Sequence, residues 1–541
     1  MPDYYEAGGS EVEVTGAGAK QSVEELTGQE LMSLMTTVPR ATRPPWMVTR
    51  FPVSMEEFQR LKEAAQEADR ESLAAFTDES NADADVEAEY EEDTPEGEEF
   101  AAEPGAFAPP ISSSFEGIPQ TAFRPPDCTC AVGPNDVMVA VNTDYAVYTK
   151  GGTLRRRLNL SVLFSNVLPS NADLFDPVIA YDHYAKRWIV VVAARRGTPV
   201  GSWLMVGVSQ GTDPLGRYWI WALDATRDGN TPTNNWADFP MLGFDTQGIY
   251  ITTNQFQFNG GFQYTKLRIL NKAELYAGGT GSNHSIKWYD FWNLKNPDNS
   301  EAFTVQPAKH FRGTGSNPPA YLVNAIWPKD NSLTLWTLKN PIGYWRGGSA
   351  SLSQDKVPCR SYDLSPDAEQ RGTSIRIETN DSRLLSAVFQ YVGNTKRIWT
   401  CHTSKITWSG ESVARSAVQW YEIDVDSKQV IQQNGYGASG KYYYFPAIQT
   451  DLRRNAYLVF GRSGSTEYAS VRQTGRRVTA PLNNLENSRL IKAGEGSYTG
   501  GRWGDYFCAC RDGGNANQVY LYGEYAETGN NWGTWIASAR F

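Results

Sequence analysis

The chain has 541 residues, and its 22 Phe, 17 Trp and 28 Tyr can fill a large core. It contains only 4 His, which argues against a multi-histidine metal centre. No apolar run approaches the roughly 20 residues of a membrane helix, so no membrane span is expected. The net charge of −11 is uneven, because residues 1–107 carry 26 acidic and 7 basic side chains while the remainder carries 35 and 43.

Residues 1–107 are predicted to be an acidic, partly disordered N-terminal arm with short helices. Its start lacks a basic segment followed by an apolar one, so no secretory signal is evident. One helix is expected over residues 22–35. A second is expected from an N-cap at Ser54, with Glu57 as its capping-box partner. Residues 78–103 are acidic and poor in large apolar side chains, which is typical of disorder.

An extended, proline-flanked run between the two helices carries apolar side chains that a purely solvating tail does not need. These anchors are Trp46, Met47, Val48, Phe51 and Val53. The run from Pro44 to Val53 is predicted to dock on a basic surface of the body, either its own or that of a neighbouring copy. Docking on a neighbour would build a homo-oligomer. The alternative is a flexible, acidic solubility tail.

From residue 108 onward, short apolar runs alternate with Gly, Asn, Asp and Pro turns. A unit of strand, polar turn and strand recurs with starts at Cys128, Asp176, Asp238, Ala320, Ser382, Tyr444 and Gly504. The spacing of about 64 residues leaves room for four strands per unit. The pattern predicts an all-β fold in which residues 108–541 form a closed seven-bladed β-propeller, with six or eight blades left open. Two tandem β-sandwiches are the competing architecture, and they predict no common period.

Several strings of the body occur in a recognisable order, namely DCTCAVGPNDVMVAVN, DPVIAYDHYAKRW, VGVSQGTDPLGRYW, DFPMLGFDTQGIYITTNQF, AVQWYEID, GRWGDYFCACRD and NNWGTWIASARF. Together they resemble a family of bacterial, mostly secreted or surface-attached, sialidase-like seven-bladed propeller proteins of largely unassigned function. The resemblance covers roughly residues 120–541. It implies a propeller fold and an extracellular or cell-surface location, and it says little about activity.

Four cysteines distinguish the chain from that family pattern. They form two pairs of alternate residues, Cys128 with Cys130 in the first unit and Cys508 with Cys510 in the last. Alternate residues of a strand point to one face, and a closed ring makes the first and last blades neighbours. One or two disulfides are therefore expected to latch the ring, with Cys359 and Cys401 as a third candidate pair. The alternatives are buried thiols that fill a gap between blades and, more remotely, a four-thiolate metal site.

Carboxylates recur at or near the starts of predicted inner strands. Asp176, Asp238 and Asp505 take these positions, and Arg502 lies close to the last of them. Such strand starts should surround one end of the central channel, where carboxylates with an arginine could bind a cation or a sugar. The alternative is that each aspartate only accepts hydrogen bonds from loop amides.

No catalytic constellation stands out from the sequence. Sialidase-type hydrolysis needs an arginine cluster, for which Arg383, Arg472 and Arg502 are candidates, but no nucleophile can be assigned. Ser209 matches the G-x-S-x-G pattern but lies in a strand that enters a turn, so its role is expected to be structural. His183, His284, His310 and His402 share no ligand spacing, so neither a metal site nor a cofactor is expected.

The sequence thus favours a non-enzymatic binding or scaffold propeller, displayed outside the cell or built into an assembly. Its partner would be another protein, or a second copy engaged through the arm, with carbohydrate as a further ligand. No robust hydrolase activity is expected. The alternative is a carbohydrate-active enzyme, a sialidase-like glycoside hydrolase with its site at the channel mouth. Nucleic acid is excluded, because no basic run is longer than 155–157.

Overall fold

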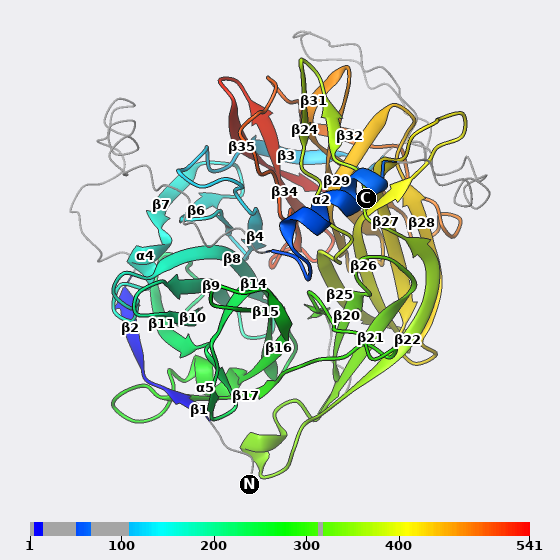
Figure 1. Ribbon diagram of the computed structural model, residues 1–541. Coiled ribbons are helices and arrows are strands. Elements are labelled where there is room, and N and C mark those ends of the chain that lie inside the picture. Colours follow the sequence, from blue (N-terminus) through cyan, green and yellow to red (C-terminus); the bar gives the residue numbers. More distant parts are fainter. Residues whose placement is uncertain (1–4, 14–49, 67–107, 312–316) are drawn as a thin grey trace, which may run out of the picture.

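A computed structural model describes residues 5–13, 50–66, 108–311 and 317–541. Strands dominate it, as the sequence predicts (Figure 1). The described helices are short: α2 (Met55–Ala64), α4 (Leu160–Leu163), α5 (Lys272–Tyr276) and the 3₁₀ turn η3 (Gly343–Arg346). Within the described ranges, no helix is long and apolar enough to cross a membrane. The predicted helix over 22–35 lies outside the described residues.

The body consists of antiparallel four-stranded meanders. The first three are β4 (Thr129–Val132), β5 (Asp136–Ala140), β6 (Asp144–Thr149) and β7 (Leu154–Asn159); β8 (Asp173–Asp182), β9 (Arg187–Arg196), β10 (Gly201–Ser209) and β11 (Arg217–Asp224); and β14 (Asn235–Phe244), β15 (Gly248–Gln257), β16 (Phe262–Asn271) and β17 (Ile286–Phe291). A small hairpin, β12 (Arg227–Asp228) with β13 (Thr231–Pro232), precedes the third meander.

The remaining sheets follow the same pattern. They are β18 (Gln306–Pro307), β20 (Ala320–Ala325), β21 (Asp330–Lys339) and β22 (Ser351–Tyr362); β25 (Ser386–Val392), β26 (Thr395–Ile406), β27 (Arg415–Asp424) and β28 (Gln429–Tyr436); β29 (Lys441–Thr450), β30 (Ala456–Gly464), β31 (Glu467–Arg476) and β32 (Arg489–Lys492); and β33 (Cys508–Arg511), β34 (Val519–Glu527) and β35 (Asn531–Ala539) with β3 (Ile111–Glu116). The short strand β19 (Lys309–Phe311) lies parallel between β14 and β25, and β23 (Ala368–Gln370) with β24 (Thr373–Ile377) forms a separate hairpin.

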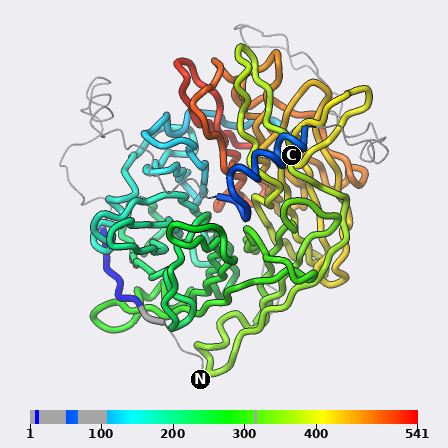
Figure 2. The backbone as a smooth tube through the Cα atoms, in the orientation of Figure 1, coloured from blue at the N-terminus to red at the C-terminus, as the bar shows by residue number. Residues whose placement is uncertain are grey.

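The first strands of successive sheets contact one another in turn, from β4 through β8, β14, β18, β25 and β29 to β33. Strand β33 in turn contacts β4, so the arrangement closes on itself as a propeller. Strand β3 comes from the start of the body and pairs with β35 near the C-terminus. The start and the end of the ring consequently lie side by side (Figure 2).

Burial on both sheet faces explains the long apolar runs. In β9 the run from Trp188 to Ala194 is buried throughout, because each face packs on a neighbouring sheet. The side chains of Trp188, Trp221 and Trp420 are completely buried. The aromatic surplus of the sequence therefore fills the core of the ring.

One repeat unit is displaced from the prediction. The unit starting at Ala320 begins with β20, which is the second strand of its sheet rather than the first. The true inner strand, Gln306–Pro307, is only two residues long and contains a proline. It carries no alternation that a reading of the sequence could detect.

The N-terminal arm contributes two edge strands and one helix to this assembly. Strand β1 (Tyr5–Ala7) pairs with β17, and β2 (Gly9–Glu13) pairs with β11, so the arm extends two neighbouring sheets. Helix α2 begins as predicted, because the Ser54 side chain accepts a hydrogen bond from the Glu57 amide at 3.2 Å. The helix lies across the ring near its centre (Figure 1).

Candidate functional site at the channel mouth

The structure brings the four residues predicted at the channel mouth into one cavity. The cavity is lined by Arg50, Phe175, Asp176, Trp236, Asp238, Phe239, Asn380, Arg383, Arg502 and Asp505. Its free space is about 20 Å³, enough for one water molecule and too small for a sugar ring. Of the arginines considered in the sequence, Arg383 and Arg502 take part, whereas Arg472 lies in β31 beside Ser488.

A recurring Xaa-Pro bulge positions the inner strands at this mouth. Asp176, Phe239 and Phe445 each precede a proline and have left-handed φ values of 51°, 52° and 50°. The register of β8, β14 and β29 shifts at these points. Proline suits a bulge because it has no amide to donate to the ladder. The Asp-Pro and Phe-Pro dipeptides at these positions are the sequence signal for the bulges.

Asp176 is fixed on this bulge by hydrogen bonds from two sides. Its amide donates to Asn142 Oδ1 at 2.7 Å, and its carboxylate accepts from the Phe239 amide at 3.2 Å. Burial and the neighbouring charge of Asp505 raise the pKa of Asp176 to about 6. This group therefore titrates in the range where a carboxyl can exchange protons near neutral pH.

Asp238 differs from Asp176 in having no hydrogen bond to its carboxylate from any residue in the described ranges. Burial, followed by the charge of Asp176, raises its pKa well above the ordinary aspartate range. Asp238 thus lines the cavity as a carboxyl whose neutral form is favoured by its surroundings.

The pKa of Asp505 is shifted in the opposite direction to that of Asp238. Burial opposes its ionisation, but the charges of Arg502, Arg50 and Arg383 outweigh burial and lower its pKa. Its carboxylate is paired with Arg502, accepts a hydrogen bond from Asn380 Nδ2 at 3.2 Å and lies 3.6 Å from Arg50 Nη1. Two carboxyls of one cavity, Asp238 and Asp505, therefore have their pKa values pushed apart.

The segment before β33 needs glycine to place Asp505. Gly504 has a φ of 82°, and a Cβ there would lie 2.2 Å from the Phe445 ring. Its amide donates to Glu524 at 2.9 Å. The close approach of Gly504 to Phe445 thus brings the Arg502–Asp505 pair against the bulge of β29.

Two deeper carboxyls were missed by the sequence analysis. Asp127 accepts a hydrogen bond from Asn142 on one oxygen, and its other oxygen has no partner in the described part of the chain. Glu524 is likewise satisfied on one oxygen only. Burial raises the pKa of both groups well above their ordinary values. Asp127 directly precedes Cys128 and lies just before β4, and this position near a strand start could have marked it as a candidate site residue.

The N-terminal arm contributes Arg50 to the lining of the cavity. Arg50 Nη2 pairs with Glu378 at 2.7 Å, and Arg383 Nη2 donates to the Arg50 carbonyl at 3.2 Å. Phe51 is fully buried and stacks on Phe58, with 3.6 Å between the ring centroids. Among the predicted anchors, Phe51 and the half-buried Val53 therefore pack on the body. Trp46, Met47 and Val48 lie outside the described residues.

The charge of the docking surface is the reverse of the prediction. The arm was expected to bring acidic groups to a basic surface, but it brings Arg50 and Lys62 to carboxylates of the body. Lys62 is 3% exposed, lies 2.9 Å from Asp367 and donates to Thr379 Oγ1 at 2.7 Å. Net charge describes a whole segment, whereas docking depends on the local charges that meet, so the docking of the full run from Pro44 to Val53 stays a prediction.

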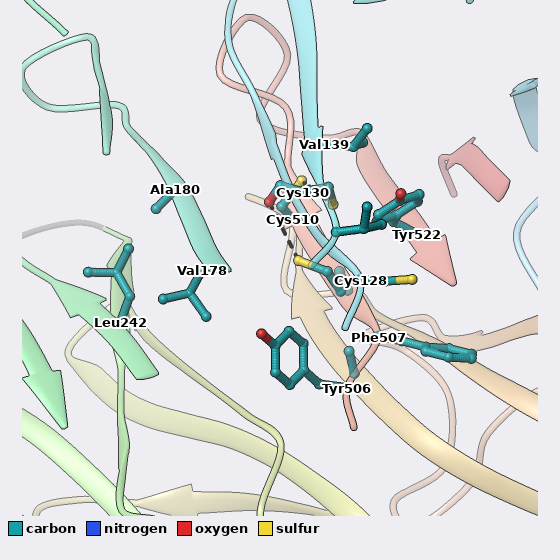
Figure 3. Packing of buried hydrophobic residues seen from close by; sticks show 14 of the residues in the cluster. Cys128, Cys130, Val139, Val178, Ala180, Leu242, Tyr506, Phe507, Cys510 and Tyr522 are labelled. Carbon is teal, nitrogen blue, oxygen red and sulfur yellow. Dashed lines mark hydrogen bonds between the residues drawn. The ribbon is translucent and has the colours of Figure 1, made fainter. Parts of the chain in front are cut away.

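The predicted disulfides are absent, and all six cysteines are free thiols. The first and last sheets do bring their cysteines together (Figure 3), with 3.3 Å between the sulfurs of Cys130 and Cys510. Cys508 Sγ donates to the Cys130 carbonyl at 3.5 Å. The thiols fill the space between two inner strands, which matches the alternative considered above. Cys359 and Cys401 lie in separate core clusters, so the third pair is not formed either.

Alkylation of the unfolded protein without reductant should therefore modify all six cysteines. The expected result of peptide mapping is six labelled cysteine peptides and no disulfide-linked peptide. A linked peptide containing Cys130 and Cys510 would contradict the free thiols, and it would restore the predicted latch.

The remaining sequence candidates have structural roles. Ser209 Oγ donates to the Gly211 carbonyl at 2.7 Å and accepts from the Trp188 amide, as expected for a turn residue. The histidines do not gather, and burial lowers the pKa of His310 to about 3 and that of His402 to about 4. No group of His, Cys, Asp and Glu in the described ranges could hold a metal ion.

No known family profile matches the chain, and no curated protein matches it. Solved structures give only distant likenesses. An α-L-arabinofuranosidase, Arb93A, from Fusarium graminearum is 9% identical over 80% of this chain and 98% of its own, with a TM-score of 0.35. A protein of unknown function from Dyadobacter fermentans is 9% identical over 69% and 97%, with a TM-score of 0.32. A GH43 endo-arabinanase from Bacillus licheniformis is 12% identical over 56% and 94%, with a TM-score of 0.25. At these TM-scores the likenesses carry no argument about activity.

Proposed function

We propose that this chain is a carbohydrate-active enzyme, a glycoside hydrolase that acts at the channel mouth. The observation that carries the proposal is the pair of carboxyls in one cavity, where burial raises the pKa of Asp238 and arginine charges lower that of Asp505. Glycoside hydrolysis uses such a pair, one carboxyl as general acid and the other as a charged partner of the reacting sugar. This proposal replaces the expectation of a purely non-enzymatic propeller.

In this proposal Asp238 donates its proton to the leaving glycosidic oxygen as that bond breaks. Asp505, held ionised by Arg502, faces the positive charge that develops on the sugar ring. Water supplies the hydroxyl that completes the product, and its second proton returns to Asp238. Trp236 and Phe239 line the same cavity and offer apolar surface to the sugar ring.

The test is the release of reducing ends from a panel of polysaccharides by the full chain and its Asp238→Asn variant. The expected loss of rate is at least about 100-fold, because the general acid is removed. Asp426→Asn is the matched control, since that side chain is 58% exposed on a turn and should leave the rate unchanged. Equal rates for the wild type and Asp238→Asn would refute the assignment.

A second candidate function rests on the closed state of the cavity. Because the arm fills the mouth, the protein would act instead as a binding or scaffold propeller, with the arm engaging its own body or a second copy. An extracellular or surface location and self-association through the arm belong to this proposal. Light scattering of the full chain would test it, because a monomer at all concentrations would rule out self-association.

The number of blades is a separate proposal about the fold. We propose that the body is a seven-bladed ring, because seven first strands contact one another in succession and the last contacts the first. The offset unit at Ala320 and the short strand β18 do not change this count.

A further inference from the structure

Arg50 is a cation that the arm inserts into a site made by the body. Its guanidinium lies 2.7 Å from Glu378 and 3.6 Å from Asp505, and its side chain is only 12% exposed. Lys62 anchors the same segment further along α2, and Phe51 is fully buried with its ring 5.2 Å from the Arg50 guanidinium. The arm thus occupies the cavity in the way a ligand would.

The two carboxylates depend on Arg50 to different degrees. Asp505 keeps Arg502 as a direct partner when Arg50 is absent. In the described part of the chain, Arg50 is the close ion-pair partner of Glu378, whose side chain is 18% exposed, and the charge of Arg502 acts on Glu378 from further away. Without Arg50, Glu378 keeps only the more distant charge of Arg502, so a group that replaces Arg50 gains by bringing a positive charge into direct contact.

We infer that Arg50 fills the subsite for a cationic group of the substrate, and that the substrate class is a glycan with free amines. The inference rests on the proposed function and deepens it. A protonated amino group carried by the sugar can form charge-assisted hydrogen bonds to Glu378 and Asp505, while the sugar ring lies against Trp236 and Phe239.

The same geometry selects against other glycans. An N-acetylated or neutral sugar leaves Glu378 unpaired, and an acidic sugar places like charges together near Glu378 and Asp505. Because the free space is about 20 Å³ with the arm in place, a glycan binds only when Arg50 and Phe51 leave. The arm therefore competes with the glycan, and weakening the arm raises the apparent affinity.

The experiment is titration calorimetry of the full-length chain with a glucosamine hexamer and with the N-acetylated hexamer. Arg50→Ala should bind the glucosamine hexamer at least about tenfold more tightly than the wild type, because the competing cation is gone. Arg50→Lys should stay close to the wild type. Arg60→Ala is the matched control, since Arg60 is 70% exposed in the same segment and pairs only with Glu57.

The double variant Arg50→Ala with Glu378→Gln should lose this gain, because the carboxylate that recognises the amine is neutralised. Its melting temperature, measured beside that of Arg50→Ala, shows whether both variants are folded. No gain for Arg50→Ala, or equal binding of the N-acetylated hexamer, would overturn the inference.

Failure of the amine-subsite inference can be distinguished from failure of the hydrolase proposal. Tight binding of the glucosamine hexamer without any cleavage would refute the hydrolase and support the amine subsite. Cleavage of a neutral polysaccharide that depends on Asp238, with no binding of amines, would support the hydrolase and refute the amine subsite.

Discussion

Arg383→Leu should lower the free energy of unfolding by about 3–5 kcal/mol, the range for breaking a buried ion pair. Arg383 and Asp381 are 4% and 3% exposed, and their paired atoms lie 2.7 and 3.0 Å apart. Without the guanidinium, the Asp381 carboxylate keeps only the Trp327 indole and a backbone amide as donors. Denaturant unfolding monitored by tryptophan fluorescence measures the difference.

The aromatic surroundings of Arg383 add to this cost. Its guanidinium lies 4.5 Å from the centre of the Phe239 ring and 4.8 Å from that of Phe303. The double variant Arg383→Leu with Asp381→Asn is the control, since it removes the orphaned charge as well. It should recover a substantial part of the stability. A cost below about 1 kcal/mol for Arg383→Leu alone would show that water or Arg50 satisfies Asp381.

The strands of the body were predictable because burial on both sheet faces leaves an unmistakable pattern. Strand β9 is a continuous apolar run, and β15 opens with the apolar run Ile249–Ile251. Strand β18 could not be found, because two residues are too few to show any period. The prediction therefore placed most inner strands correctly and failed where the inner strand was shortest.

The candidate site was only half predictable. Asp176 and Asp238 follow from the repeat, because equivalent strand starts meet at one end of a ring. The pairing of Arg50 with Glu378 joins residues 328 positions apart, and no local pattern encodes such a contact. The cavity is therefore built by the repeat, whereas its closure depends on a tertiary contact of the arm.

The disulfide prediction failed for a related reason. Alternation correctly placed Cys130 and Cys510 on facing sides of neighbouring strands. Whether two sulfurs bond depends on the separation and orientation of the strands, which the sequence does not contain.

Asp176→Asn should become more stable relative to the wild type as pH rises from 4 to 7, by on the order of 3 kcal/mol. Burial, and then the charge of Asp505, raises the pKa of Asp176 to about 6 in the folded protein. The folded state therefore holds a proton that the unfolded chain releases near pH 4. The stability due to this proton is complete below about pH 4 and is lost as pH rises through 6. Asparagine cannot titrate, so the variant does not share this loss.

Denaturant unfolding of both proteins at pH 4, 5, 6 and 7 measures the effect. Asp505→Asn is a second variant in the same cluster, because the charge of Asp505 contributes to the raised pKa of Asp176. Removing that charge lowers the pKa of Asp176, so Asp505→Asn should lose less stability than the wild type between pH 4 and 7. A flat or inverted profile for Asp176→Asn would mean that Asp176 is already ionised at low pH in the folded state. The carboxyl beside Asp238 would then be a fixed charge at the channel mouth, and it would not titrate near neutral pH.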